Sequence, residues 1–394
     1  MLERVLDEGV EYGQLRLTWP DGRHCLFGDG EPAGTLLLHE ARVARRILAD
    51  PEFMLGQAYM DGHWSTPDLR ALLTVLMSNF AREQRGGARR AADWLLRPLQ
   101  QWNRRSASRR NVAHHYDIDE QLFRRFLDRD LQYSCGYWPA GTDDLESAQA
   151  QKRALVRRKL CLTPGQSVLD IGCGWGGLAI ELAEQTDARV VGLTLSSEQA
   201  RVARARVREH GLEDRVSIRL QDYRDVPERF DRIVSVGMFE HVGAAYYDQY
   251  YRAVRDHLTP DGVALIHTIG RLGRPAVTNP WIRRYIFPGG YIPSLSEVTP
   301  AIERQGLATT DIEVLRQHYA LTLAEWFQRF QAVRGDIAAE KGERFCRLWE
   351  FYLAVSEMAF HYRGLAVFHL QLARDPTAVP LTRDYLLEAE KARS

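Results

Sequence analysis

The segment 168–177 reads VLDIGCGWGG, and it constrains the fold more than any other stretch of the chain. An apolar run ends at Ile171, glycines follow, and the apolar residues 178–180 begin a helix-like stretch. Glycine lets the backbone approach a ligand where any Cβ would clash. Open α/β sheets bind their ligands at the carboxyl ends of central strands. The pattern therefore predicts an α/β protein that binds a nucleotide-like ligand at this loop.

Segments with strand and helix periodicity alternate around and after the glycine loop. The expected strands are 167–171, 189–193, 216–220, 232–236 and 263–269, and the expected helices are 178–185, 197–210 and 246–257. Such alternation predicts a parallel, doubly wound sheet with helices on both faces. The aromatic-rich stretch 320–374 predicts a largely helical end to the chain.

Residues 1–80 predict a separate small α+β domain. Residues 14–19 alternate as a strand does, 20–22 form a turn, and 41–48 have the pattern of a short helix. We find no catalytic constellation in this part of the sequence.

The segment 81–110 is strongly basic. It holds nine arginines against Glu83 and Asp93, and Trp94 and Trp102 lie among leucines at helical spacing. A basic amphipathic helix with tryptophan suits an anionic lipid surface. The alternative is a solvated linker helix whose apolar face packs on a neighbouring domain.

The overall composition excludes several classes of protein. The formal net charge is zero, which argues against a dedicated nucleic-acid binder. The five cysteines are widely spaced, so neither a disulfide framework nor a zinc site is expected. The histidines show no spacing suited to metal ligands, and we expect no metal. The start, MLERVLDE, lacks the features of a secretory signal, and no apolar run approaches the ~20 residues that span a bilayer. We therefore expect a cytoplasmic protein.

Two classes of ligand fit the glycine loop. The spacing Gly172-x-Gly174-x-x-Gly177 matches a dinucleotide fingerprint, which also requires an acid about 20 residues later. That place reads GLTLS at 192–196, without an acid, whereas Asp170 precedes the first glycine. Two later segments follow in order, namely QDY at 221–223 after the third expected strand and FDRIVS at 230–235 at the start of the fourth. Asp170, the glycine loop and these two segments together resemble class I methyltransferases, which are Rossmann-like and bind S-adenosylmethionine. The resemblance implies cofactor contacts from Asp170, Gly172, Gly174, Gly176, Thr194, Leu195, Gln199, Asp222 and Tyr223.

Five more segments strengthen and narrow the resemblance. They are QYSCGYW at 132–138, MFEHVG at 238–243, LIHTIG at 265–270, IFPGGYIP at 286–293 and QHY at 317–319. With the glycine loop, they resemble the cyclopropane-fatty-acyl-phospholipid synthase family from about residue 110 to the C-terminus. The first 110 residues resemble the additional N-terminal domain of its phospholipid-acting bacterial members.

The family transfers a methyl group from S-adenosylmethionine to a cis double bond of a lipid acyl chain. A base is needed only after the transfer, and the family holds a bicarbonate ion for it. The resemblance implies a bicarbonate cradle of Cys135, Glu240, His267, the backbone of Ile269, and Tyr319, and cofactor contacts from Tyr133 and Ser134.

The same resemblance sets the expected organisation and partners. Residues 1–80 form a domain that docks on lipid, 81–110 a basic amphipathic linker, and 111–394 the catalytic methyltransferase domain. The substrate is an unsaturated membrane phospholipid, reached from the anionic cytoplasmic face of the membrane, and a homodimer is a further expectation.

Several alternatives stay open from the sequence. Methylation of the same alkene could give a methylene or methyl-branched chain, and a small amine could be the acceptor instead. A lipid-binding module without catalysis and a dinucleotide-dependent oxidoreductase are the remaining hypotheses.

Overall fold

The computed structural model describes residues 1–80 and 120–387, and these fall into two compact units. One unit consists of 1–80 with the later segments 276–288 and 320–365, and the other of 120–275, 289–319 and 366–387. The N-terminal segment is thus completed by two stretches of the region expected to form the catalytic domain. The predicted basic linker, 81–110, lies outside the described residues.

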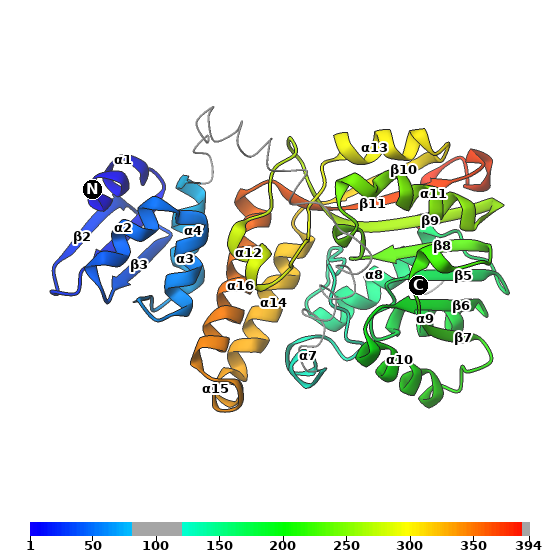
Figure 1. Cartoon of the computed structure of the whole chain (residues 1–394), viewed down its shortest axis with the longest axis horizontal. Coiled ribbons are helices and arrows are strands. Elements are labelled where there is room, and N and C mark those ends of the chain that lie inside the picture. Colours follow the sequence, from blue (N-terminus) through cyan, green and yellow to red (C-terminus); the bar gives the residue numbers. More distant parts are fainter. Residues whose placement is uncertain (81–119, 388–394) are drawn as a thin grey trace. The chain divides into compact units, whose positions relative to one another are not determined.

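The second unit is built on a sheet of seven described strands in the order β10-β11-β9-β8-β5-β6-β7 (Figure 1). The strands are β5 (Ser167–Ile171), β6 (Arg189–Thr194), β7 (Val216–Leu220), β8 (Phe230–Val236), β9 (Leu258–Arg271), β10 (Ala308–Leu315) and β11 (Leu365–Ala373). Strands β5 to β9 pair in parallel, and β10 is antiparallel to β11. From β5 the chain proceeds to β6 and β7 on one side, then returns to β8 on the other. The ends of β5 and β8 therefore form the crevice where such sheets bind ligands.

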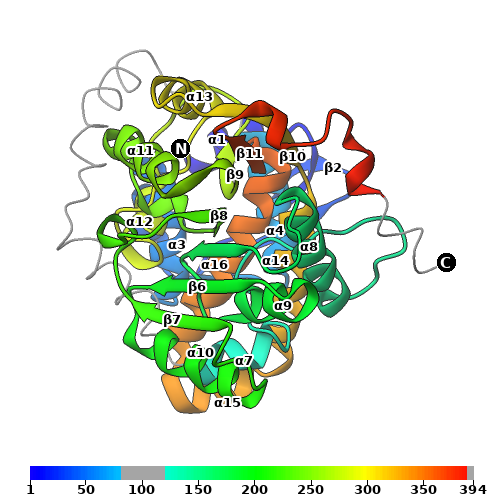
Figure 2. The same ribbon diagram turned by 90° about the vertical axis from the view of Figure 1, so that its right-hand side faces the viewer.

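Helices cover both faces of this sheet (Figure 2). The described part of this unit begins with α7 (Glu120–Phe126). One hydrophobic core contains residues of α8 (Leu145–Lys159), α9 (Gly177–Thr186) and α10 (Ser197–Glu209). The other core contains residues of α11 (Tyr247–His257) and α13 (Leu295–Arg304). Successive residues of β5 alternate between them, because Val168 joins the first core and Leu169 the second. The doubly wound α/β fold is confirmed.

The first unit is α+β, as expected for residues 1–80. Its sheet has the order β2-β1-β3-β4, formed by β1 (Gly13–Thr18), β2 (His24–Asp29), β3 (Ala33–Leu38) and β4 (Trp64–Ser65). Its helices are α1 (Leu2–Gly9), α2 (Ala41–Ala49), α3 (Pro51–Met60), α4 (Leu69–Phe80), α12 (Pro280–Tyr285), α14 (His318–Ala332, whose first two residues belong to the second unit), α15 (Arg334–Lys341) and α16 (Glu343–Tyr362). Tyr59 of α3 donates a 2.6 Å hydrogen bond to Glu350 of α16, and Arg70 of α4 pairs with Glu357. These contacts hold α16 against the N-terminal helices.

The largely helical character expected for 320–374 is confirmed, because α14, α15 and α16 occupy most of this stretch. The stretch also contains the strand β11 (Leu365–Ala373), which the sequence expectation did not include. Every residue of β11 is buried, so the strand lacks the alternation of apolar and polar residues that marks a half-exposed strand. None of the described helices is long and apolar enough to cross a membrane.

Candidate active site

The loop between β5 and α9 depends on glycines in left-handed backbone conformations. The φ angle is +88° at Gly172, +53° at Gly174 and +82° at Gly176, where other residues would be strained. The amides of Gly172 and Cys173 donate hydrogen bonds of 3.0 and 2.8 Å to the carbonyl of Leu193. The loop is therefore fixed to the carboxyl end of the neighbouring strand β6.

A cavity of about 160 Å³ lies at this loop and gathers most of the residues predicted to bind the cofactor. Ten of those eleven residues line it, namely Tyr133, Ser134, Asp170, Gly172, Gly174, Thr194, Leu195, Gln199, Asp222 and Tyr223. The exception is Gly176. A Cβ added at Gly176 would lie 3.1 Å from the Cβ of Ala203 in α10, so this glycine allows the loop to pack on the helix.

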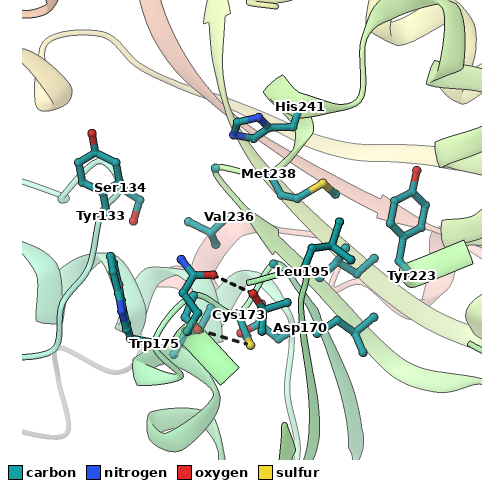
Figure 3. Close-up of a pocket in the computed structure, with 18 of the residues that line it drawn as sticks. Tyr133, Ser134, Asp170, Cys173, Trp175, Leu195, Tyr223, Val236, Met238 and His241 are labelled. Atoms are coloured by element: carbon teal, nitrogen blue, oxygen red, sulfur yellow. Dashed lines mark hydrogen bonds between the residues drawn. The ribbon is translucent and has the colours of Figure 1, made fainter. Parts of the chain in front are cut away.

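Other residues of the cavity were not predicted, among them Trp175, Arg224, Met238 and His241. Figure 3 shows Tyr133, Ser134 and Trp175 on one side of the cavity and Tyr223 on the opposite side. Trp175 and Tyr133 both pack on Phe123, each with ring centroids 5.0 Å apart. Trp175 stands between two glycines of the motif, and this position is the signal that could have identified it.

Asp170 places a carboxyl group in the wall of the cavity at the end of β5. The side chain is buried, and among the described residues its Oδ2 atom has no hydrogen-bond partner. Burial raises the pKa of Asp170 to about 7, against the opposing influence of the Lys152 cation. A buried carboxyl with an unengaged oxygen suits a positively charged ligand group.

Lys152 of α8 lies behind the same wall and is fully buried. Its Nζ donates hydrogen bonds of 2.5 Å to Oε1 of Gln132 and 3.0 Å to Oγ of Ser134, and both partners line the cavity. Burial lowers the pKa of Lys152 to about 8. Lys152 thus fixes the loop that carries Ser134 and acts electrostatically on Asp170.

The polar groups after β6 and β7 are already paired with one another. Thr194 and Gln199, which replace the acid absent after β6, share a 2.8 Å hydrogen bond between Oγ1 and Oε1. Asp222 accepts two hydrogen bonds from the guanidinium of Arg224, at 2.8 and 2.5 Å. Both pairs hold polar side chains in fixed positions at the cavity.

Glu240 lies in the short 3-10 turn η2 (Phe239–His241) after β8, beside the cavity residue His241. Its Oε1 accepts a 2.6 Å hydrogen bond from the amide of Ile269 on β9. Within the described ranges its Oε2 is buried without a hydrogen-bond partner. Burial raises the pKa of Glu240 to about 7, although the Ile269 amide opposes this shift. The amide of Ile269 is thus occupied by Glu240. The carbonyl of Ile269 accepts a 3.0 Å hydrogen bond from Thr268 Oγ1.

The other predicted cradle residues are also buried in this unit. Cys135 follows the loop residue Ser134, His267 lies two positions before Ile269 on β9, and Tyr319 lies in the first turn of α14. Burial lowers the pKa of His267 well below its usual value, and the Lys152 cation adds to this effect. His241 in the cavity wall has its pKa lowered by burial to about 4. Both imidazoles are therefore neutral at physiological pH.

Residues 103–370 match the sequence model of the mycolic acid cyclopropane synthetase family. The chain belongs to this family. The resemblance to cyclopropane-fatty-acyl-phospholipid synthases seen in the motifs is thereby confirmed.

Two relatives and one solved structure define this similarity. The chain is 40% identical over 337 residues to the cyclopropane-fatty-acyl-phospholipid synthase of Escherichia coli K12, covering 84% of this chain and 85% of that protein. It is 37% identical over 395 residues to the tuberculostearic acid methyltransferase of Mycobacterium tuberculosis, covering 94% and 90%. A crystal structure of a mycolic acid cyclopropane synthase complexed with SAH and CTAB matches with a TM-score of 0.64 at 34% identity, over 67% of this chain and 97% of that one.

Proposed function

We propose that this enzyme transfers the methyl group of S-adenosylmethionine to a cis double bond of an unsaturated phospholipid acyl chain and closes a cyclopropane ring. Its family and its similarity to the E. coli synthase make it an S-adenosylmethionine-dependent methyltransferase. One structural observation supports the chemistry. Met238, His241 and Val242 line the cavity, while Glu240 in the same turn bonds to β9. The turn that forms part of the cavity wall therefore also carries an acid group, whose carboxyl bonds to β9.

The walls of the cavity fit S-adenosylmethionine. We assign the charged end of this molecule to Asp170, with Tyr133 and Ser134 near the sulfonium. Thr194, Leu195, Gln199, Asp222 and Tyr223 would hold the nucleoside, because they line the cavity beyond the carboxyl ends of β6 and β7. When bound, S-adenosylmethionine supplies an electrophilic methyl group. The rings of Tyr133 and Trp175 favour a nearby positive charge by about 0.5–2 kcal/mol each.

An alkene acceptor sets a specific demand for a base. The π electrons form the new bond to the methyl carbon as the carbon–sulfur bond breaks, which leaves a carbocation on the acyl chain. A C–H bond of the new methyl group then gives its electrons to close the ring, and its proton must be accepted. We assign this step to the segment around Glu240, where a buried carboxyl of raised pKa can exchange a proton near pH 7.

We further propose that bicarbonate, when bound there, is the base that takes this proton from the new methyl group, and that the Glu240 carboxylate then accepts it from the ion. Cys135, Glu240, His267, the Ile269 backbone and Tyr319 would hold it. The unengaged Oε2 of Glu240 and the Ile269 carbonyl are acceptors for the ion's O–H, and His267 can donate to its oxygens. The Lys152 cation acts on His267, and it would also stabilise an anion there.

A second product has an observation in its favour. The tuberculostearic acid methyltransferase matches 94% of this chain, more than the E. coli synthase does. A methyl-branched or methylene product would share the first step and differ only in the fate of the carbocation. The product must therefore be identified chemically.

We propose that residues 1–80 and the basic segment 81–110 dock the enzyme on the anionic cytoplasmic face of the membrane, with a homodimer as the expected assembly. Nine arginines and two tryptophans in 81–110 support this docking. Flotation with anionic and with zwitterionic vesicles tests it. Replacement of Arg104, Arg105, Arg109 and Arg110 by Gln should weaken binding to anionic vesicles and reduce its dependence on salt. Equal binding of both proteins to both kinds of vesicle would contradict the docking role.

The test of the reaction uses purified protein, unsaturated phospholipid vesicles, S-adenosylmethionine and bicarbonate. Mass spectrometry should show acyl chains heavier by one CH₂, and NMR should show upfield ring protons. The same mass gain with vinylidene protons would establish the methylene product instead. No mass gain would reject an acyl-chain acceptor.

A further inference from the structure

Strand β11 (Leu365–Ala373) carries a buried histidine, His369. All nine residues of Leu365–Ala373 are buried, and His369 lies among them. Its Nε2 lies 2.7 Å from Nδ1 of His267 on β9, and the two rings are 4.7 Å apart between centroids. His369 is absent from every motif that marked the active site, yet it bonds directly to one of the predicted cradle residues.

Neither ring of this pair carries a positive charge near neutral pH. Burial lowers the pKa of both His267 and His369 well below the usual value, and the cations of Lys152 and Lys159 act in the same direction. Each ring therefore holds one hydrogen, so one of its nitrogens donates and the other accepts. The hydrogen bond between them then allows two arrangements.

The surroundings of His369 distinguish these arrangements. Its Nδ1 is buried and has no hydrogen-bond partner in the part of the chain that the structure describes. If His267 donated from Nδ1, His369 would have to carry its hydrogen on Nδ1, as a buried N–H without an acceptor. If His369 donates from Nε2, its Nδ1 holds only a lone pair. Unpaired buried N–H groups are rarer than unpaired acceptors, so the second arrangement is favoured.

This arrangement determines the protonation of the other ring nitrogen of His267, Nε2. With Nδ1 accepting, the single hydrogen of this ring is on Nε2. We infer that His369 is a positioning residue that fixes His267 as the Nε2–H tautomer, so that His267 presents an N–H donor to an oxyanion at the acceptor side of the site. This inference rests on the proposed function, in which that oxyanion is bicarbonate.

The tautomer can be measured without turnover. In 15N-histidine-labelled protein, the His267 ring signals are assigned by their disappearance in His267→Asn. In the wild-type protein, Nε2 should have the chemical shift of a protonated nitrogen and Nδ1 that of an unprotonated one. The reverse pattern would overturn the inference, even if the enzyme makes cyclopropane lipids. If the predicted tautomer is found but bicarbonate has no effect on turnover, the proposed role of bicarbonate is rejected and the role of His369 in setting the tautomer stands.

Two variants then separate positioning from packing. His369→Leu removes the donor, and the KM for bicarbonate should rise about tenfold, as for one lost hydrogen bond, while the affinity for S-adenosylmethionine stays unchanged. His369→Gln retains an amide donor and should restore most of the bicarbonate affinity. His210→Leu, at an exposed histidine of α10's end, controls for the substitution itself. The inference would be contradicted by a wild-type KM for bicarbonate in His369→Leu, or by an equal rise of this KM in the Leu and Gln variants. If the Leu variant fails to fold, the tautomer of the wild-type protein and the KM of the Gln variant still decide the question.

Discussion

The amide of Ile269 donates a 2.6 Å hydrogen bond to the carboxylate of Glu240, which ties the turn after β8 to β9. One oxygen of Glu240 is thereby fixed, and the other is buried without a partner among the residues described. A neighbouring residue, His241, faces the cavity assigned to S-adenosylmethionine. We propose that the carboxyl group serves the acceptor side of the reaction, while His241 in the same turn serves the cofactor side.

This division predicts the effect of Glu240→Gln. Glutamine can still accept the Ile269 hydrogen bond, but it cannot take up a proton. We expect product formation to fall by about 10²-fold or more, with S-adenosylmethionine affinity unchanged. Calorimetry measures the affinity, and mass spectrometry of the acyl chains measures the product. Glu303→Gln, at an exposed position of α13, is the control. Loss of cofactor binding with partial turnover would show that Glu240 belongs to the donor side.

The raised pKa of Asp170 predicts pH-dependent cofactor binding. Burial raises this pKa to about 7, so the carboxylate that attracts a cation is formed only as the pH rises through that value. S-adenosylmethionine affinity should therefore increase roughly tenfold from pH 6 to pH 8, and Asp170→Asn should abolish the increase. A wild-type affinity that is flat over this range would contradict the assignment of Asp170.

The same shift predicts how the stability of the ligand-free protein depends on pH. The folded state binds the Asp170 proton more tightly than the unfolded state, so the protonated form favours folding at low pH. This contribution is lost as the pH rises from about 4 to about 7, and the loss is on the order of 4 kcal/mol if the full shift is realised. Asp170→Asn should therefore raise the melting temperature more at pH 8 than at pH 5. A similar effect of the substitution at both pH values would show that Asp170 is not buried as described.

Gly174 and Gly211 offer a matched test of the glycine loop. Both have positive φ, +53° and +64°, and a Cβ added to either would meet no atom within 4 Å. Substitution of either glycine by alanine should lower the free energy of unfolding by about 1 kcal/mol, because the backbone at a positive φ is strained for alanine. Only Gly174 lines the cavity, so only Gly174→Ala should weaken S-adenosylmethionine binding. Equal affinities in the two variants would mean that the ligand does not approach Gly174.

The sheet around the cofactor site was predictable because glycines and short apolar runs mark the ends of its strands. The expected strands 167–171 and 216–220 coincide with β5 and β7. Gly176 was assigned to the ligand from its motif, but the motif cannot distinguish a glycine that meets a ligand from one that packs on Ala203.

What the sequence did not predict depends on contacts between distant segments. Gly56 of α3 closely approaches Trp281 and Phe351, and a Cβ there would lie within 2.9 Å of both side chains. No local pattern announces that 276–288 and 320–365 pack with the N-terminal segment. His369 was missed for a similar reason, because a single histidine in an apolar strand becomes informative only when its partner on β9 is known.

Lys152 provides the last prediction, since it couples the Ser134 loop to the ionisation of Asp170. Lys152→Met removes both hydrogen bonds, to Gln132 and Ser134, and we expect S-adenosylmethionine affinity to fall about tenfold. It also removes the cation that lowers the pKa of Asp170, so the rise in affinity with pH should move to higher pH. Titration of the binding constant from pH 6 to pH 9 measures both effects.

Lys159→Met is the matched control for this prediction. Lys159 is a second buried lysine of α8, but it pairs with Glu313 on β10 and has no resolved effect on Asp170. Its loss should leave the pH at which cofactor affinity rises unchanged. If both variants move that pH equally, the effect of Lys152→Met comes from disruption of α8 rather than from the charge of Lys152 beside Asp170.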